Sequence, residues 1–326
     1  RSSAASAQIL RQKLKTGEFG RDVIFISTTK QYNSTTVEKF EEDDACVTQL
    51  YGIPISNTLL MYVVLILFLF SNRKKITEVV AMSSPGTNII VLAFLSLFFK
   101  TRYYIQDVFP DAKLFALGVE KLKYLAWPIM FICYKKIDRL IIISNTMANY
   151  INTNYFTQCE VVSNPSNISS VKRVTSKKSR SSSKVFFMSG NFSHAHGYDL
   201  PVKVLTELYH NNFQLDLNGF GHNFEKLRSS KIFPESIFGN FMTKDAYEKK
   251  LTAVDVFLIF QDYGYERFCY TSKFTSLFAI PSAQFVYVGP ACDISDTLKS
   301  TGRGIHIERS DSGKDIIEKV RSLVSG

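Results

Sequence analysis

Residues 185–221 read VFFMSGNFSHAHGYDLPVKVLTELYHNNFQLDLNGFG, and this stretch decides the fold class. Two short segments, 185–188 and 213–217, are expected strands, and each leads into a turn that contains glycine and asparagine. The first is an unbroken apolar run, which is typical of a strand buried on both faces of a parallel sheet, whereas Gln214 and Asp216 interrupt the second. Residues 200–209, between these segments, carry apolar side chains at the spacing of a helix. The stretch therefore predicts a strand–helix–strand unit of a doubly wound α/β domain.

The same alternation of strands and helices extends in both directions from this unit. Toward the C-terminus we expect strands over 256–260, 284–288 and 304–307, a short edge element from residue 237, and helices over 244–253, 272–278, 294–300 and 313–325. Toward the N-terminus we expect strands over 23–26, 79–82, 102–105, 140–143 and 160–162, with helices in the intervals. The fold class predicted is α/β, with two Rossmann-like doubly wound domains that face each other across a cleft.

The domain boundaries follow from a change in composition. Residues 164–184 are rich in Ser, Lys and Arg and separate a first domain, 1–163, from a second domain, 185–326. This linker lacks the interleaved aromatic residues that nucleic-acid binding needs, so no nucleic-acid partner is predicted. The chain begins at Arg1 and opens on a predicted helix rather than a strand, so we expect the first strand of the first domain to be missing.

The composition excludes several classes of protein. The 326 residues are 45% hydrophobic and include 27 Phe but only 16 Gly and 9 Pro, which excludes disordered and collagen-like chains. The five cysteines are scattered and form no CxxC pair, which favours reduced thiols in the cytoplasm and no structural zinc. The net charge of +10 predicts an anionic partner: nucleic acid, a membrane surface or a small molecule that carries phosphate.

Two apolar blocks, residues 59–70 and 89–99, are followed by basic residues. Each is much shorter than the ~20 residues of a membrane-spanning helix, so a true span is rejected. Buried helices of the first domain are the favoured interpretation. An interfacial helix whose basic residues meet anionic lipid headgroups is the alternative.

Several short motifs, taken in order along the chain, resemble those of GT-B glycosyltransferases of family 4, in particular the branch that builds bacterial O-antigen and capsule. In the first domain these are Gly17 after the opening helix, Ser83-Ser84-Pro85, the segment from Ile105 to Asp111, and Asp138 ahead of Ser144-Asn145-Thr146-Met147. In the second domain they are Ser189-Gly190-Asn191, the segment from His194 to Gly197, Asn218-Gly219-Phe220-Gly221, the segment from Thr271 to Phe274, and Tyr287-Val288-Gly289-Pro290 with Asp293-Ile294.

The resemblance implies a retaining, metal-independent transferase that needs no cofactor and uses a UDP-sugar as donor. The departing diphosphate must then be neutralised by cations and backbone N–H groups, for which Lys273, directly after Ser272 at a predicted helix start, is suited. The other donor-binding candidates are Gly190, Asn191, His194, His196, Gly219, Gly221, Gly289 and Asp293. Asp293 is a candidate for the ribose hydroxyls or, equally, for a helix N-cap.

On the acceptor side, Asp107 follows a predicted strand, where its carboxylate would orient or deprotonate an acceptor hydroxyl; a turn aspartate is the equal alternative. The acceptor implied is a glycan on a polyprenyl diphosphate, with the protein peripheral on an anionic membrane surface at the inner face of the cell membrane. One departure from the wider family is Ser276, where a second glutamate after Glu266 is usual. A UDP-sugar epimerase and a non-catalytic subunit of a membrane complex are the alternatives.

Overall fold

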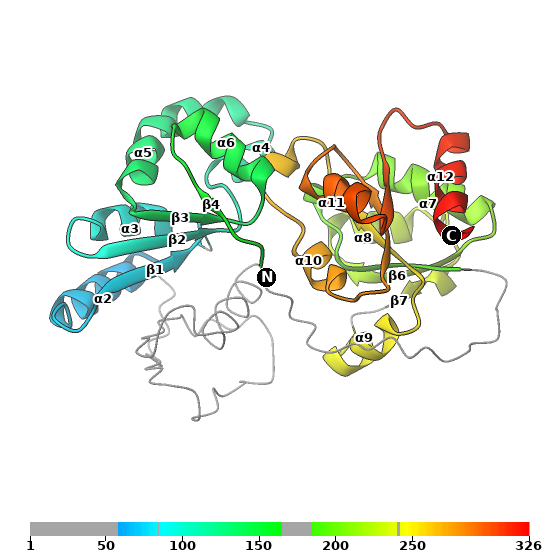
Figure 1. Cartoon of the computed structure of the whole chain (residues 1–326), viewed down its shortest axis with the longest axis horizontal. Helices are drawn as coiled ribbons and strands as arrows, with labels where there is room; N and C mark the ends of the chain where they lie inside the picture. Colours follow the sequence, from blue (N-terminus) through cyan, green and yellow to red (C-terminus); the bar gives the residue numbers. More distant parts are fainter. Residues whose placement is uncertain (1–57, 84, 165–183, 240–241, 326) are drawn as a thin grey trace.

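A computed structural model describes residues 58–83, 85–164, 184–239 and 242–325. Its strands form two parallel sheets, which lie in separate halves of the molecule (Figure 1). The predicted helix near residue 10 and the predicted strand 23–26 lie outside the described residues, as does most of the predicted linker.

The first sheet has four strands in the order β1-β2-β3-β4. Its strands are β1 (Glu78–Met82), β2 (Lys100–Ile105), β3 (Arg139–Ile142) and β4 (Glu160–Val161), and the helices that precede or connect them are α2 (Thr58–Ser71), α3 (Asn88–Leu95), α4 (Asp111–Ala116), the short η1 (Glu120–Leu122), α5 (Lys123–Lys136) and α6 (Asn145–Tyr155). Helices α3, α5 and α6 pack on one face of the sheet, where Tyr103, Ile105 and Ile142 meet them.

The second sheet has six strands in the order β10-β9-β8-β5-β6-β7. Its strands are β5 (Val185–Asn191), β6 (Gln214–Phe220), β7 (Phe238–Gly239), β8 (Val256–Phe260), β9 (Gln284–Val288) and β10 (Gly304–Ile307). The helices are η2 (His194–His196), α7 (Asp199–His210), α8 (His222–Ser229), η3 (Glu235–Ile237), α9 (Lys244–Leu251), η4 (Tyr265–Arg267), α10 (Ser272–Phe278), α11 (Asp293–Thr301) and α12 (Gly313–Ser325).

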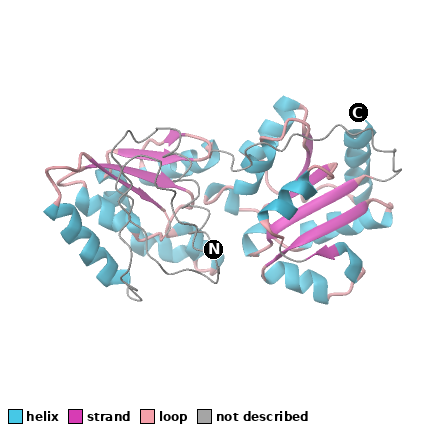
Figure 2. Cartoon of the chain, turned by 90° about the horizontal axis from the view of Figure 1, so that it is seen from below, coloured by secondary structure: helices cyan, strands magenta, loops and turns pink. Residues whose placement is uncertain are grey.

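Strand β8 shows why this sheet is covered on both faces. All five of its residues, VFLIF, are buried. Val256, Leu258 and Phe260 join the core beneath α7, α8 and α12, while Phe257 and Ile259 join the core beneath α9, α10 and α11. Because successive side chains of a strand point to opposite faces, a continuous apolar run fills two cores. Helices accordingly flank both sides of the six-stranded sheet (Figure 2). The predicted fold class is confirmed.

The two apolar blocks both form helices, α2 and α3, as the sequence predicts. They are not buried on every side: Leu59 and Leu67 of α2, and Ile90 and Phe94 of α3, are exposed. None of the described helices combines the length and the hydrophobicity that crossing a bilayer requires.

Residues 264–270, here called the interdomain segment, leave the second sheet after β8 and pack against the first domain. The side chain of Phe268 is fully buried in the first domain's core. The backbone N–H of Val108 donates to the carbonyl oxygen of Phe268 at 2.8 Å, and Arg267 lies 3.2 Å from the carboxylate of Glu120. The two domains therefore meet at a buried junction, and α10 begins directly after it.

Candidate functional site

The glycine turns predicted to bind the donor meet at the carboxyl ends of β5 and β6. Gly190 lies opposite Gly219 in the parallel register. A methyl group on Gly219 would lie 2.5 Å from the carbonyl oxygen of Gly190, so only glycine allows this close approach. Asn191 directs its side-chain oxygen at Gly221, the residue before α8. Four of the candidate residues thus form one edge of the sheet, which we call the glycine edge.

Lys273, the second residue of α10, crosses from its helix to the glycine edge. Gly190 has a φ of +101°, and a methyl group there would lie 2.9 Å from Cε of Lys273. The ammonium donates to the hydroxyl of Tyr247 at 3.3 Å and lies 4.5 Å from the centre of that ring. The Tyr247 hydroxyl also lies 3.2 Å from Oγ of Ser189. A positive charge is therefore fixed in place over the end of β5.

The sequence did not indicate Tyr247, which lies on α9. It belongs to a predicted helix, but no local pattern tells which residue of that helix meets Lys273. Ser272, the other predicted residue at this helix start, is the first residue of α10. Since α10 has only seven residues, the positive charge at this place comes from the Lys273 side chain rather than from a helix dipole.

The two predicted histidines lie on η2, in the loop after β5. The His194 ring stacks on the His222 ring, with centroids 4.8 Å apart. The Nδ1 atom of His196 accepts from the backbone N–H of Ser193 at 3.2 Å, and burial lowers the pKa of His196 to about 4. His196 is therefore neutral near pH 7, with its proton on Nε2, so it can donate to a sugar hydroxyl but cannot supply charge for a phosphate.

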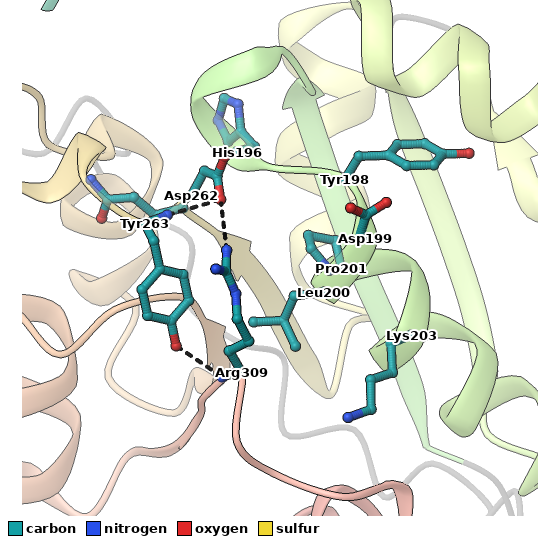
Figure 3. A pocket seen from close by; sticks show the side chains of 10 residues that line it. His196, Tyr198, Asp199, Leu200, Pro201, Lys203, Asp262, Tyr263 and Arg309 are labelled. Atoms are coloured by element: carbon teal, nitrogen blue, oxygen red, sulfur yellow. Dashed lines mark hydrogen bonds and ion pairs between the residues drawn. The ribbon is translucent and has the colours of Figure 1, made fainter. Parts of the chain in front are cut away.

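A pocket of about 440 Å³ opens beside this loop (Figure 3). It lies between the start of α7, the end of β8 and the residues after β10, and His196, Asp199, Lys203, Asp262, Tyr263 and Arg309 are among its lining residues. Arg309 lies 4.5 Å from the centre of the Tyr263 ring and 3.9 Å from the carboxylate of Asp262. The pocket therefore presents two cations and two carboxylates next to the loop that carries His196.

Gly289 and Asp293 lie further along the same sheet. The carbonyl oxygen of Gly289 is 2.8 Å from Nε2 of His306, and Gly289 packs on the backbone of Gln261. Asp293 is the first residue of α11, and its carboxylate accepts from the backbone N–H of Thr146 at 3.2 Å and from its hydroxyl at 3.3 Å. Asp293 is not the N-cap, because Cys292 holds that position. In this structure Asp293 makes a contact between the domains.

Asp107 lies at the carboxyl end of β2, beside the junction. Its backbone forms an isolated antiparallel bridge with Cys269, and its N–H donates to Oγ of Ser83 at 3.1 Å. Among the described residues no group hydrogen-bonds its carboxylate, and burial raises the pKa of Asp107 above its ordinary value. A carboxylate in this state is a stronger base than an exposed aspartate.

The structure thus brings together five predicted donor residues, Gly190, Asn191, Gly219, Gly221 and Lys273. Asp107 belongs to the other domain, but its bridge partner Cys269 precedes Lys273 by only four positions. Within the described ranges, no three His, Cys, Asp or Glu side chains lie close enough together to hold a metal ion.

Neither a protein-family profile nor a curated protein matches this sequence. Solved structures do match. The glycosyltransferase from Rickettsia africae ESF-5 superposes with a TM-score of 0.61 at 13% identity, over 97% of this chain and 83% of its own. The chain has the GT-B fold. OtsA matches with a TM-score of 0.53 at 7% identity, over 82% of this chain and 69% of its own. TarM matches with a TM-score of 0.51 at 14% identity, over 78% of this chain and 51% of its own. At these identities the GT-B likeness is one of fold, and the family 4 resemblance remains a prediction.

Proposed function

We propose that this chain is a glycosyltransferase that moves a sugar from a UDP-sugar to a glycan carried on a polyprenyl diphosphate, with retention at the anomeric carbon. The observation that carries the proposal is the position of the Lys273 ammonium over Gly190, at the carboxyl ends of β5 and β6. In open α/β sheets ligands bind outside the carboxyl ends of the strands. The solved structures that share this GT-B fold include one described as a glycosyltransferase.

On the donor side, breaking the bond between the anomeric carbon and the diphosphate leaves negative charge on the departing UDP. Lys273 supplies the compensating positive charge, and Tyr247 holds its ammonium in place. The close backbone approach of Gly190 and Gly219 leaves this edge free of side chains that would block a diphosphate. Neutral His196 suits a hydroxyl of the sugar.

On the acceptor side, the attacking group is a hydroxyl of the glycan. The Asp107 carboxylate accepts a hydrogen bond from this hydroxyl and orients its oxygen toward the anomeric carbon. As the new glycosidic bond forms, the hydroxyl proton leaves, either to this carboxylate or to the departing phosphate. The lipid carrier places this acceptor at the inner face of the cell membrane, on an anionic surface that suits a chain of net charge +10.

Binding of nucleotides to the purified chain tests the donor site. UDP, GDP and CMP are titrated in a thermal-shift assay against the wild type, Lys273→Ala and Lys314→Ala. Lys314 is a matched control, since it is an exposed lysine at the second position of α12. We expect UDP alone to stabilise the wild type, by about 2.7 kcal/mol at one hundred times its Kd. Loss of the ammonium–phosphate contact in Lys273→Ala should weaken UDP binding by about tenfold to a hundredfold.

The proposal fails if no nucleotide stabilises the folded protein, or if Lys314→Ala loses as much affinity as Lys273→Ala. No nucleotide binding together with copurification of a tight partner would favour the non-catalytic subunit. Conversion of a UDP-sugar to its epimer without any acceptor, followed by NMR, would identify an epimerase.

A further inference from the structure

In the part of the chain that the structure describes, helices α3 and α5 expose an apolar surface. Ile90 and Phe94 of α3 are each 45% exposed, and Leu125, Ile129 and Ile132 of α5 are 77%, 57% and 57% exposed. Their spacings of three and four residues place them on one side of each helix. We call these five residues the α3/α5 face.

The α3/α5 face is continuous because both helices cover the same side of the first sheet. The sides of α3 and α5 that point to the sheet are buried, with Leu92 and Met130 in the same core. Two neighbouring helices that bury their inner sides on one sheet present their outer sides to the same direction. Figure 1 shows both helices in the half of the molecule that holds the four-stranded sheet. A contiguous exposed apolar surface of this kind marks a site of interaction.

Positive charge surrounds this surface. Residues 112–136 contain five lysines and a single acidic residue, Glu120. That carboxylate is paired with Arg267 at 3.2 Å and with Lys123 at 3.8 Å. Lys121 and Lys136, near the two ends of α5, are exposed. Apolar side chains flanked by lysines fit an anionic lipid surface, because acyl chains accept the former and headgroup phosphates attract the latter.

Residues 112–136 follow closely after Asp107, the residue proposed to bind the acceptor hydroxyl. Helix α4 begins at Asp111, four residues after Asp107. Phe115 of α4 contacts the junction, with its ring centre 4.8 Å from that of Tyr265. The chain then continues through a turn and η1 into α5. A lipid-borne acceptor whose glycan reaches Asp107 would therefore have its membrane beside the segment that carries these apolar residues.

We propose that the α3/α5 face, centred on α5, is the surface by which this protein docks on an anionic bilayer. This proposal rests on the proposed function, in which the acceptor is carried on a lipid. It specifies which surface of the protein contacts the membrane. The sequence patterns had pointed to the apolar blocks 59–70 and 89–99, and not to α5. Residues 124–134 of α5, YLAWPIMFICY, are an apolar run as well, with Pro128 inside it and lysines at both ends of the helix.

Trp127, the chain's single tryptophan, is a reporter placed on this helix. Its indole N–H donates to the carbonyl oxygen of Asn154 at 2.8 Å, and its ring stacks on Phe131 with centroids 5.0 Å apart. It is therefore held in a fixed position in the helix that we place at the membrane. Energy transfer from Trp127 to a dansyl-labelled lipid reports the approach of α5 to a bilayer.

The test is sedimentation of the full chain with vesicles of phosphatidylcholine, with or without phosphatidylglycerol, combined with energy transfer from Trp127. We expect binding to the anionic vesicles with transfer, and little binding to the neutral ones. Leu125→Gln and Ile129→Gln should each weaken binding about tenfold or more. Ile232→Gln is the matched control, an exposed isoleucine of the second domain, and should bind like the wild type. Lys121→Gln with Lys136→Gln should weaken binding to anionic vesicles by roughly tenfold or more.

Unchanged binding of the Leu125 and Ile129 variants overturns the proposal, and so does wild-type binding without energy transfer. A dimer in solution that these same variants dissociate, with no binding to vesicles, would show that the face is an interface between proteins. No nucleotide is present in these measurements. A negative result with vesicles therefore does not contradict the proposed donor site. In the same way, a failure of UDP binding does not contradict the proposed docking surface.

Discussion

At the scale of single residues, burial of the Asp107 carboxylate carries a cost in stability. This carboxylate lies at the interdomain junction, burial raises its pKa, and no described group hydrogen-bonds it. A folded-state pKa above the unfolded value means that folding favours the protonated acid. The stability that the protonated acid contributes is present at low pH and is lost as the pH rises through the raised pKa. Such a cost is typical of a group retained for chemistry rather than for stability.

Replacing Asp107 by Asn should therefore stabilise the protein while impairing transfer. At pH 7 the variant should melt roughly a few degrees higher than the wild type, because no charge is buried. The difference should vanish below about pH 4, where the wild-type carboxyl is also neutral. Melting curves at pH 7 and at acid pH measure this, and UDP affinity should be unchanged. A lower melting temperature at pH 7 would show that the carboxylate is structurally satisfied, as a turn aspartate is.

The candidate site could be predicted in part because some of its signals are local. Gly190 and Gly219 stand in predicted turns, although the structure places them among the last residues of β5 and β6, and Lys273 follows at a helix start. Tyr247 carries no such signal, because its contact with Lys273 joins residues 26 positions apart. The same holds for Asp293, whose partner Thr146 is 147 positions away. Residue type indicated a polar role for Asp293 but not its partner.

At the scale of elements, the interdomain segment is a part of the second domain that completes the core of the first. Phe268 is fully buried and packs on Phe115 and Tyr150, with ring centroids 5.3 and 4.9 Å apart. Arg267, next to it, is partly exposed and pairs with Glu120. The neighbouring side chains therefore contribute to stability in different ways, Phe268 by burial and Arg267 by a screened ion pair.

This difference predicts two distinct losses of stability. Phe268→Ala should lower the free energy of unfolding by about 3–5 kcal/mol, through lost burial and a cavity. Arg267→Gln should lower it by only about 0–1 kcal/mol, because the pair is near the surface. Urea unfolding of both variants measures the two values. Equal losses would mean that Phe268 is not part of the first domain's core.

Elements are well predicted wherever their pattern lies within their own length. Helix α12 is found over Gly313–Ser325, as the sequence predicts, because Ile316, Val320 and Leu323 recur at helical spacing and are buried. The interdomain segment shows the limit of this approach. Its residues read as a connection between β8 and α10, since the residues that Phe268 meets lie far away in the sequence. Long-range packing has no local period to reveal it.

At the scale of the whole molecule, the described residues join the two domains through burial, an ion pair and hydrogen bonds. On the interdomain segment, Phe268 contributes burial and a backbone hydrogen bond from Val108, and Arg267 contributes an ion pair with Glu120. Away from this segment, Asp293 accepts hydrogen bonds from Thr146, which joins the starts of α11 and α6. The relative position of the domains is thus fixed at two separate places. The proposed reaction needs a fixed position of one domain relative to the other, because Lys273 and Asp107 belong to different domains.

Asp293 either binds the ribose of the donor or joins the two domains, and a double-mutant cycle distinguishes these two roles. If Asp293 acts through Thr146, then Asp293→Ala and Thr146→Val each lower stability, and the double variant loses less than the sum, with a coupling of about 0.5–1.5 kcal/mol. UDP affinity should then change little in Asp293→Ala. A ribose contact predicts the reverse: additive effects on stability and a clear loss of UDP affinity in Asp293→Ala alone. Thermal unfolding and UDP titration of the four proteins, wild type included, distinguish these outcomes. The Thr146 hydroxyl and backbone N–H both donate to this carboxylate, so we expect the coupled result.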